Sequence, residues 1–174
     1  MSADNARKNM LYFGYGSNMC TGRLRARVSS AEPLGRFSLK GYRFSFNKRS
    51  NDGSGKGNVE HTGVDADVVW GVLFEFDANQ KQALDGAEVG YDELLVDVEC
   101  EADRKTGVYI YAAYNNAYNN IDNNLKPYSW YKRFVTEGAR QHELPPAYIK
   151  FLEAFPESED PDRARDRRKR AITC

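Results

Sequence analysis

The sequence predicts a single α+β domain, and three observations support this class. Short segments in which apolar and polar residues alternate recur along the 174 residues, as is typical of half-buried strands. Fewer segments carry apolar residues at helical spacing, and these do not alternate strictly with the strands. A hydrophobic content of 41% and an aromatic content of 13% provide enough apolar surface for one core.

The charge balance gives no general sign of a nucleic-acid or membrane partner, because 25 basic residues offset 25 acidic ones. No apolar run approaches the roughly 18 residues of a membrane helix, and the first residues lack the hydrophobic stretch of a signal peptide. Cys20, Cys100 and Cys174 are odd in number and widely spaced. We therefore expect a cytoplasmic protein with reduced thiols, without a disulfide framework or a zinc site.

The first element after a disordered leader over residues 1–9 is a strand over 11–15 that enters the segment "YFGYGSN". Its glycines allow the backbone to turn and to approach a neighbour closely, and Ser17 and Asn18 are good helix caps. A helix is expected over 19–28. A turn of this kind exposes backbone N–H groups that can hold an anion.

The middle of the chain begins with a half-buried strand, because apolar and polar residues alternate over 42–47. Residues 48–63 are rich in Gly, Ser and Asn and predict a long mobile loop, without the spacing of a Walker phosphate loop. The stretch 68–76 is apolar on both faces and predicts a central strand. A short helix capped by Asp77 follows.

The second half is expected to hold strands over about 90–100 and 107–114, an asparagine-rich loop over 115–127, and two helices. The helices cover 129–141, where apolar residues recur at helical spacing, and a segment from the Pro145–Pro146 pair to about Phe155.

The segment 156–174 has almost no apolar content and ends in a basic cluster. We expect a solvated, flexible tail, with contact to nucleic acid or an acidic partner as the alternative.

Catalytic candidates are few. The two histidines, His61 and His142, lie in no hydrolase or metalloprotease frame, and no residues show metal-ligand spacing, so we expect no metal. Most carboxylates occupy outward strand positions or helix caps. Glu88 differs because it lies in the connection between a helix and a strand, where a side chain can point into a cleft.

Four segments in order resemble the gamma-glutamylcyclotransferase family: "YFGYGSN", "VVWGVLFEF", "ALDGAE" and "PYSWYKRFVTEGARQHELPPAY". The resemblance covers roughly Leu11 to Phe155. It implies a domain over residues 10–155 in which a small, twisted, mixed β-barrel is flanked by helices.

The enzymes of this family act on gamma-glutamyl amino acids, dipeptides or amines, and release 5-oxoproline and the free amine without a cofactor. The resemblance therefore implies a small gamma-glutamyl substrate, with no nucleic acid or membrane as partner of the domain and a monomer or homodimer as the assembly. Glu88 matches the catalytic glutamate. The implied substrate-binding residues are Tyr12, Phe13, Gly14, Tyr15, Gly16, Ser17, Asn18, Tyr91, Tyr111 and Tyr131.

This chemistry fits the residues that the chain offers. The substrate's own α-amine attacks its γ-carbonyl, so the protein needs no nucleophile, and one carboxylate can take a proton from the ammonium and return it to the leaving nitrogen. An ordinary glutamate is a weak base for an ammonium, so we expect desolvation to raise the pKa of Glu88.

Alternatives remain at this point. One is a cyclotransferase that removes a gamma-glutamyl group from a larger metabolite or a lysine side chain, and another is a non-catalytic gamma-glutamyl-binding module. Glutathione-specific relatives tend to carry leucine at the position of Asn18, which favours simpler gamma-glutamyl compounds here. Val89 stands where the family usually has glycine, which leaves the direction of Glu88 open.

Overall fold

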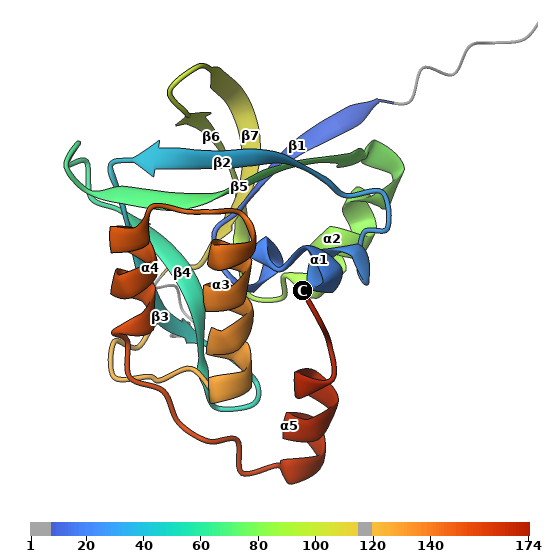
Figure 1. Ribbon diagram of the computed structural model, residues 1–174, viewed down its shortest axis with the longest axis vertical. Coiled ribbons are helices and arrows are strands. Elements are labelled where there is room, and N and C mark those ends of the chain that lie inside the picture. The colour runs from blue at the N-terminus through green and yellow to red at the C-terminus, as the bar shows by residue number, and fades with distance from the viewer. Residues whose placement is uncertain (1–7, 115–119) are drawn as a thin grey trace, which may run out of the picture.

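The computed structural model describes residues 8–114 and 120–174, and its centre is a closed barrel of five strands in the order β1-β5-β2-β6-β7 (Figure 1). All neighbouring pairs are antiparallel except β1 and β7, which are parallel, so the barrel is mixed. This confirms the predicted α+β class and the mixed barrel. The strands are β1 (Asn9–Gly14), β2 (Glu32–Lys40), β5 (Val68–Asp77), β6 (Asp92–Glu99) and β7 (Arg104–Ala112).

Strand β5 is the central strand predicted from its apolar run, since it pairs with β1 on one side and β2 on the other. Its residues Val72, Leu73 and Phe74 are fully buried. At Gly71, a Cβ atom would lie 2.5 Å from the carbonyl oxygen of Gly14, so the contact between β5 and the end of β1 requires glycine. This close contact fixes the place where β1 ends. Strand β2, by contrast, has no counterpart among the predicted elements.

A second sheet consists of the hairpin of β3 (Tyr42–Arg49) and β4 (Gly55–His61). The predicted mobile loop over 48–63 is therefore wrong for most of its length. Its small and polar residues pair through the backbone, and the Asn58 side chain bonds both backbone groups of Ala113, at 2.8 and 3.1 Å. The turn contains Gly53 at φ +84°, a conformation that favours glycine.

Five α-helices and two 3-10 turns complete the described part of the chain. Helix α3 lies beside α4, as Figure 1 shows, and packs against the turn η1. At Gly138 of α3, a Cβ atom would lie 2.5 Å from the backbone nitrogen of Cys20, so this packing also requires glycine. The elements are η1 (Ser17–Met19), α1 (Thr21–Arg25), η2 (Ala78–Gln80), α2 (Lys81–Ala87), α3 (Ser129–Gln141), α4 (Pro146–Glu153) and α5 (Arg163–Arg170).

The helices differ from the predictions mainly near the N-terminus. Helices α3 and α4 confirm the predicted segments, whereas the helix expected over 19–28 is only the short α1. Of the leader expected over 1–9, residues 1–7 lie outside the described residues and Asn9 is the first residue of β1. No helix in the described ranges is long and apolar enough to cross a membrane.

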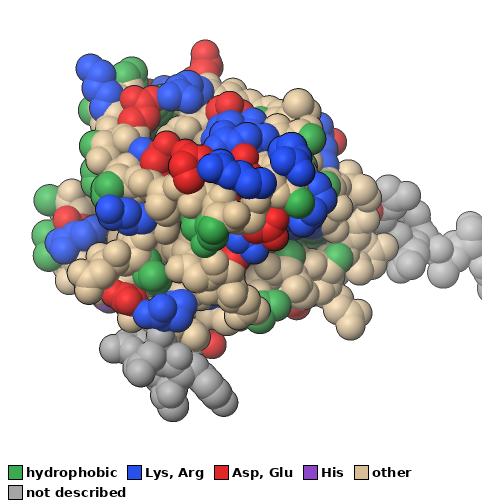
Figure 2. Space-filling view, turned by 90° about the horizontal axis from the view of Figure 1, so that it is seen from below, with side chains coloured by type: hydrophobic (Ala, Val, Ile, Leu, Met, Phe, Trp, Pro, Cys, Tyr) green, Lys and Arg blue, Asp and Glu red, His purple; other side chains and the backbone are tan. Residues whose placement is uncertain are grey.

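The segment expected to be a flexible tail differs from that expectation, because it folds against the domain. Asp160 is fully buried and accepts hydrogen bonds from Trp130 Nε1 at 2.8 Å and from the Arg165 guanidinium at 2.6 and 2.7 Å. Arg165 holds the pKa of Asp160 well below its usual range. Arg170 donates to Ser129 at the start of α3, at 2.6 Å. Figure 2, seen from the side on which α5 lies, shows Lys and Arg interspersed with acidic side chains.

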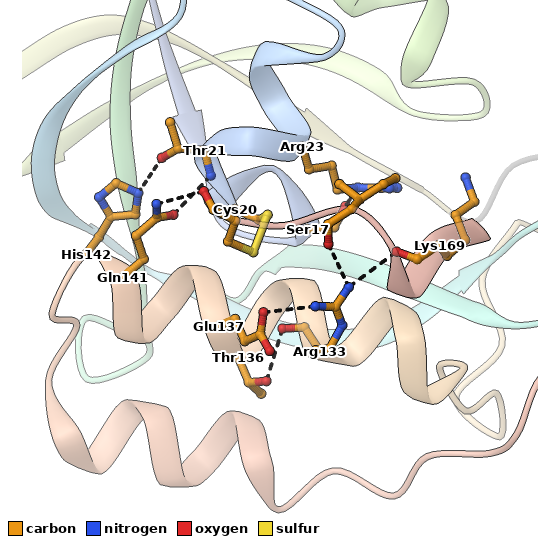
Figure 3. The surroundings of a disulfide bond; sticks show 12 residues. Ser17, Cys20, Thr21, Arg23, Arg133, Thr136, Glu137, Gln141, His142 and Lys169 are labelled. Atoms are coloured by element: carbon orange, nitrogen blue, oxygen red, sulfur yellow. Dashed lines mark hydrogen bonds and ion pairs between the residues drawn. A yellow bond between two sulfur atoms is a disulfide. The ribbon is translucent and has the colours of Figure 1, made fainter. Parts of the chain in front are cut away.

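The chain end is also bonded covalently, through a disulfide between Cys20 and Cys174 (Figure 3). The expectation of reduced thiols is therefore wrong for these two cysteines, and the cysteine-based argument for a cytoplasmic protein no longer applies. Their 154-residue separation gives no pairing signal, and only the docking of the tail brings their Cα atoms to 4.7 Å. The carbonyl of Cys174 accepts bonds from Gly22 N and Gln141 Nε2, at 3.1 and 3.0 Å. Cys100 is free.

We expect Cys174→Ser to lower the free energy of unfolding by about 2–4 kcal/mol, because a disulfide that closes a long loop restricts the unfolded chain. The measurement is the guanidinium midpoint with and without dithiothreitol. Dithiothreitol should lower the midpoint of the wild type and of the control Cys100→Ser, but not that of Cys174→Ser. A wild-type midpoint that does not respond to the reductant would contradict the disulfide.

Candidate functional site

The turn η1 directs polar side chains inward just after β1 ends. Backbone bonds from Met19 to Gly16 (3.1 Å) and from Cys20 to Ser17 (3.2 Å) close the turn. Ser17 and Asn18 were expected to cap a helix, but neither cap of η1 has a side-chain hydrogen bond. Both side chains are buried instead, at 8% and 4% exposure.

These side chains line a narrow inner cavity of about 30 Å³. It unites the turn, the α2–β6 connection, β4, β7 and α3. Of the residues predicted for the site, Phe13 and Gly14 are not part of the lining: the Phe13 ring is in the core against Gly71, and Gly14 faces the ring of Phe74. The lining residues are Tyr12, Tyr15, Gly16, Ser17, Asn18, Gly57, Glu88, Tyr91, Tyr111 and Tyr131.

Glu88 points toward the turn η1 rather than into solvent. Its Oε1 accepts a hydrogen bond from Asn18 Nδ2 at 2.7 Å and lies 3.8 Å from Arg27 Nη1, and its side chain is 13% exposed. Asn18 is itself fixed, because its Nδ2 also donates to the Tyr12 hydroxyl and its Oδ1 accepts from Arg27, both at 3.0 Å. Burial raises the pKa of Glu88 above its ordinary value, and Arg27 and Asn18 partly oppose that rise.

The residue after Glu88 does not disturb this geometry. Val89 is 67% exposed, at the rim of the site, and its carbonyl accepts a hydrogen bond from Lys48 Nζ at 2.8 Å. The short connection is further closed by a bond from Tyr91 N to the Glu88 carbonyl at 3.2 Å. The departure from the family's usual glycine therefore places an apolar side chain outward and leaves Glu88 facing Asn18.

Two tyrosines hold the backbone of Gly57 at the cavity wall. Tyr91 donates its hydroxyl proton to the Gly57 carbonyl at 2.7 Å, and Gly57 N donates to the Tyr131 hydroxyl at 3.0 Å. Burial raises the pKa of both tyrosines, so both are neutral at ordinary pH. The hairpin β3–β4 is thereby fastened to the site.

The tyrosine hydroxyls divide into two groups. Tyr15 donates to the backbone carbonyl of Tyr111, and Tyr111 donates to Asp85, so these protons are used within the protein. The hydroxyl of Tyr12 accepts from Asn18 and donates to no acceptor within residues 8–114 and 120–174, whereas the hydroxyl of Tyr131 accepts from Gly57 N and also shares a hydrogen bond with the Ser17 side chain. Tyr12 therefore has a proton with which to contact a ligand.

A larger outer cavity of about 400 Å³ adjoins the inner one, and Ser17, Glu88, Tyr91 and Tyr131 line both. Glu88 thus lies where the two cavities meet. The outer cavity is also lined by five basic side chains, which the sequence interpretation did not assign to the site: Arg23, Arg27, Lys48, Arg49 and Lys56.

Part of this lining could have been found from the sequence. Lys48, Lys56 and Gly57 fall in the segment interpreted as a mobile loop, but Asp52-Gly53 within it is a typical hairpin turn signal between two strands. Neither cavity contains a histidine, since His142 bonds Thr21 elsewhere, at 2.8 Å. Among the described residues, no group of three His, Cys, Asp or Glu side chains is placed to hold a metal ion.

Comparison with known proteins agrees with the fold. Residues 68–152 match the model of the AIG2-like family. The human gamma-glutamylcyclotransferase is 26% identical over 160 residues, covering 85% of this chain and 79% of that protein, and the bovine protein is 26% identical over 154 residues with the same coverage. A solved gamma-glutamyl cyclotransferase superposes with a TM-score of 0.76 at 25% identity, covering 87% of this chain and 90% of its own. The chain is therefore similar to gamma-glutamylcyclotransferases over most of its length, in sequence and in fold.

Proposed function

We propose that the protein is a gamma-glutamylcyclotransferase that converts a gamma-glutamyl amino acid or amine to 5-oxoproline and the free amine. The observation that carries this proposal is the position of Glu88: a largely buried carboxylate held 2.7 Å from Asn18 of the turn η1, at the junction of two cavities. The family relationship supports the same reaction.

The substrate would span the junction. The inner cavity is too small for a whole gamma-glutamyl group, so that group would occupy it in part, with the γ-amide next to Glu88 and the leaving half in the outer cavity. Glu88 takes a proton from the substrate's α-ammonium, and the amine nitrogen attacks the γ-carbonyl carbon. The attacking nitrogen still carries two protons in the tetrahedral intermediate. The protonated Glu88 gives its proton to the leaving nitrogen as the C–N bond breaks, then takes one proton from the ring nitrogen and passes it to the released amine, which leaves as an ammonium. The products are 5-oxoproline and the amine.

The raised pKa of Glu88 suits both steps. A buried carboxylate is a stronger base toward the ammonium than an exposed one, and its acid form can later protonate the leaving nitrogen.

The turn η1 and Tyr12 offer donors for the developing negative charge. In the described ranges, the N–H groups of Gly16, Ser17 and Asn18 donate no hydrogen bond to another backbone group. These groups and the free hydroxyl proton of Tyr12 support a role in holding the α-carboxylate or the oxyanion of the tetrahedral intermediate. Holding the amine close to the carbonyl adds acceleration by proximity.

The alternatives make different demands on the same site. A pure binding module would not require Glu88 to face the turn, so the Asn18 contact favours catalysis. A gamma-glutamyl group on a larger metabolite or a lysine side chain is compatible with the outer cavity. Measuring 5-oxoproline release from a panel of gamma-glutamyl-alanine, gamma-glutamyl-ε-lysine and glutathione distinguishes these substrate classes.

We expect Glu88→Gln to lower kcat for 5-oxoproline release about 10²- to 10⁴-fold, because the amide cannot transfer the proton. Glutamine can still accept the hydrogen bond from Asn18, so the fold should be kept. The product is measured by mass spectrometry. The matched control is Glu101→Gln, at an exposed position outside both cavities. Activity of Glu88→Gln equal to that of the control would rule out Glu88 as the proton carrier.

The acid limb of the pH–kcat profile should report the pKa of Glu88, with activity lost as the pH falls through it and the carboxylate becomes protonated. Arg27 lowers this pKa, so Arg27→Gln should move the acid limb to higher pH. The control Arg25→Gln removes an exposed guanidinium that pairs with Glu32, and should leave the limb in place. A limb that stays fixed or moves to lower pH in Arg27→Gln would contradict the assignment.

A further inference from the structure

We propose that the outer cavity is a binding site for an acidic leaving half, so that the preferred substrates are gamma-glutamyl compounds of amino acids that carry a second carboxylate. This inference rests on the proposed function and names the substrate class of the same site. It is carried by the side chains that line the cavity and by the way in which their charges are compensated.

The lining of the outer cavity carries far more basic than acidic side chains. Five basic side chains face the outer cavity, whereas Glu88 is the one acidic residue among the lining residues that the structure describes. Positive charge of this density in a cavity attracts anions and raises their local concentration. A neutral or cationic leaving half would leave this charge without a partner.

Three of the five charges already have acidic neighbours. Arg49 Nη2 lies 2.7 Å from Asp122, and Lys56 Nζ lies 2.9 Å from Asp52. Arg27 faces Glu88. The remaining two, Arg23 and Lys48, have no carboxylate within ion-pair distance in the described part of the chain, so the cavity keeps an excess of two positive charges.

Arg23 is buried and oriented for a ligand. It is 7% exposed, its Nε donates to Ser17 Oγ at 3.2 Å, and its guanidinium carbon lies 4.6 Å from the centre of the Phe134 ring. Its two terminal nitrogens donate no hydrogen bond within the described residues, yet they are not fully enclosed. Figure 3 shows the guanidinium extended beyond Ser17, on the side where Lys169 projects. A planar fork with two free nitrogens suits a carboxylate.

Lys48 supplies the second charge next to the reacting amide. Its Nζ donates to the Val89 carbonyl at 2.8 Å and lies 4.8 Å from the centre of the Tyr91 ring. The backbone bond uses one of its three donors. Lys48 is 8% exposed, and burial lowers its pKa, so a bound anion would stabilise its charged form.

The charge of the substrate can match this excess. At neutral pH a gamma-glutamyl compound of an uncharged amino acid has two carboxylates and one ammonium, hence a single net negative charge. Gamma-glutamyl-glutamate has one carboxylate more and brings two net negative charges. It therefore balances Arg23 and Lys48 together, whereas its near-isosteric amide gamma-glutamyl-glutamine does not.

The test compares kcat/KM for gamma-glutamyl-glutamate and gamma-glutamyl-glutamine, two peptides that differ by one charge and hardly in shape. We expect the acidic peptide to be preferred about tenfold, with most of the difference in KM. The preference should shrink at high ionic strength, because salt screens the attraction.

Variants then locate the preference. Lys48→Gln can keep the hydrogen bond to Val89 while it removes the charge, and should bring the two kcat/KM values to within about twofold of each other. Lys48→Arg should restore the preference. Lys105→Gln removes a charge that is paired with Asp103 on the β6–β7 hairpin, outside both cavities, and should leave the preference unchanged.

The outcomes separate the inference from the proposed function. Release of 5-oxoproline at equal rates from both peptides, or faster from the amide, overturns the acidic leaving half and leaves the cyclotransferase in place. Release from no substrate in the panel removes the proposed function. The charge preference is then decided by calorimetric binding of the two peptides to Glu88→Gln: tighter binding of the acidic peptide supports the inference, and equal binding overturns it.

Discussion

The site depends on one hydrogen bond, from Asn18 to Glu88, which joins two segments that are 70 residues apart in the sequence. Asn18 is held in the turn η1, and the turn is held because two neighbouring backbones approach it closely. On the barrel side, Gly71 lets β5 touch the end of β1, and on the helix side Gly138 lets α3 touch Cys20. Any larger side chain at either glycine would displace the turn, and Asn18 would no longer meet the carboxylate.

The same hydrogen bond also affects the pKa of Glu88. Burial raises the pKa of Glu88, while Asn18 and Arg27 stabilise its charged form in the cavity. Arg27 also binds the Asn18 carbonyl, so the amide is fixed at both ends and cannot rotate away. A carboxylate in this position is a compromise between burial, which raises its pKa, and pairing, which keeps it ionised.

The parts of the fold that were predictable are those in which a single segment carries its own signal. The double-sided apolar run of β5, the alternation of β6 and the helical spacing in α3 needed no tertiary information. Glu88 was singled out by its position in a helix-to-strand connection together with the resemblance of its segment to a known family. The strand β4 was missed because its small polar residues gain their order from partners far along the chain, such as Ala113 for Asn58. The basic lining of the outer cavity was missed for the same reason. The disulfide was missed because no local spacing of the cysteines encodes their pairing.

The buried indole of Trp130 makes the docking of the tail optically accessible. It is one of two tryptophans in the chain, it is 2% exposed, and its Nε1–H is bonded to Asp160. Lys56 and Lys169 lie over its ring, at 4.6 and 5.4 Å from the ring centre. An indole between a carboxylate on its edge and cations on its face is in a strong local field, which changes when the segment that carries Asp160 and Lys169 leaves. Its fluorescence is therefore a reporter within the protein, separate from turnover, of whether the segment after α4 is seated.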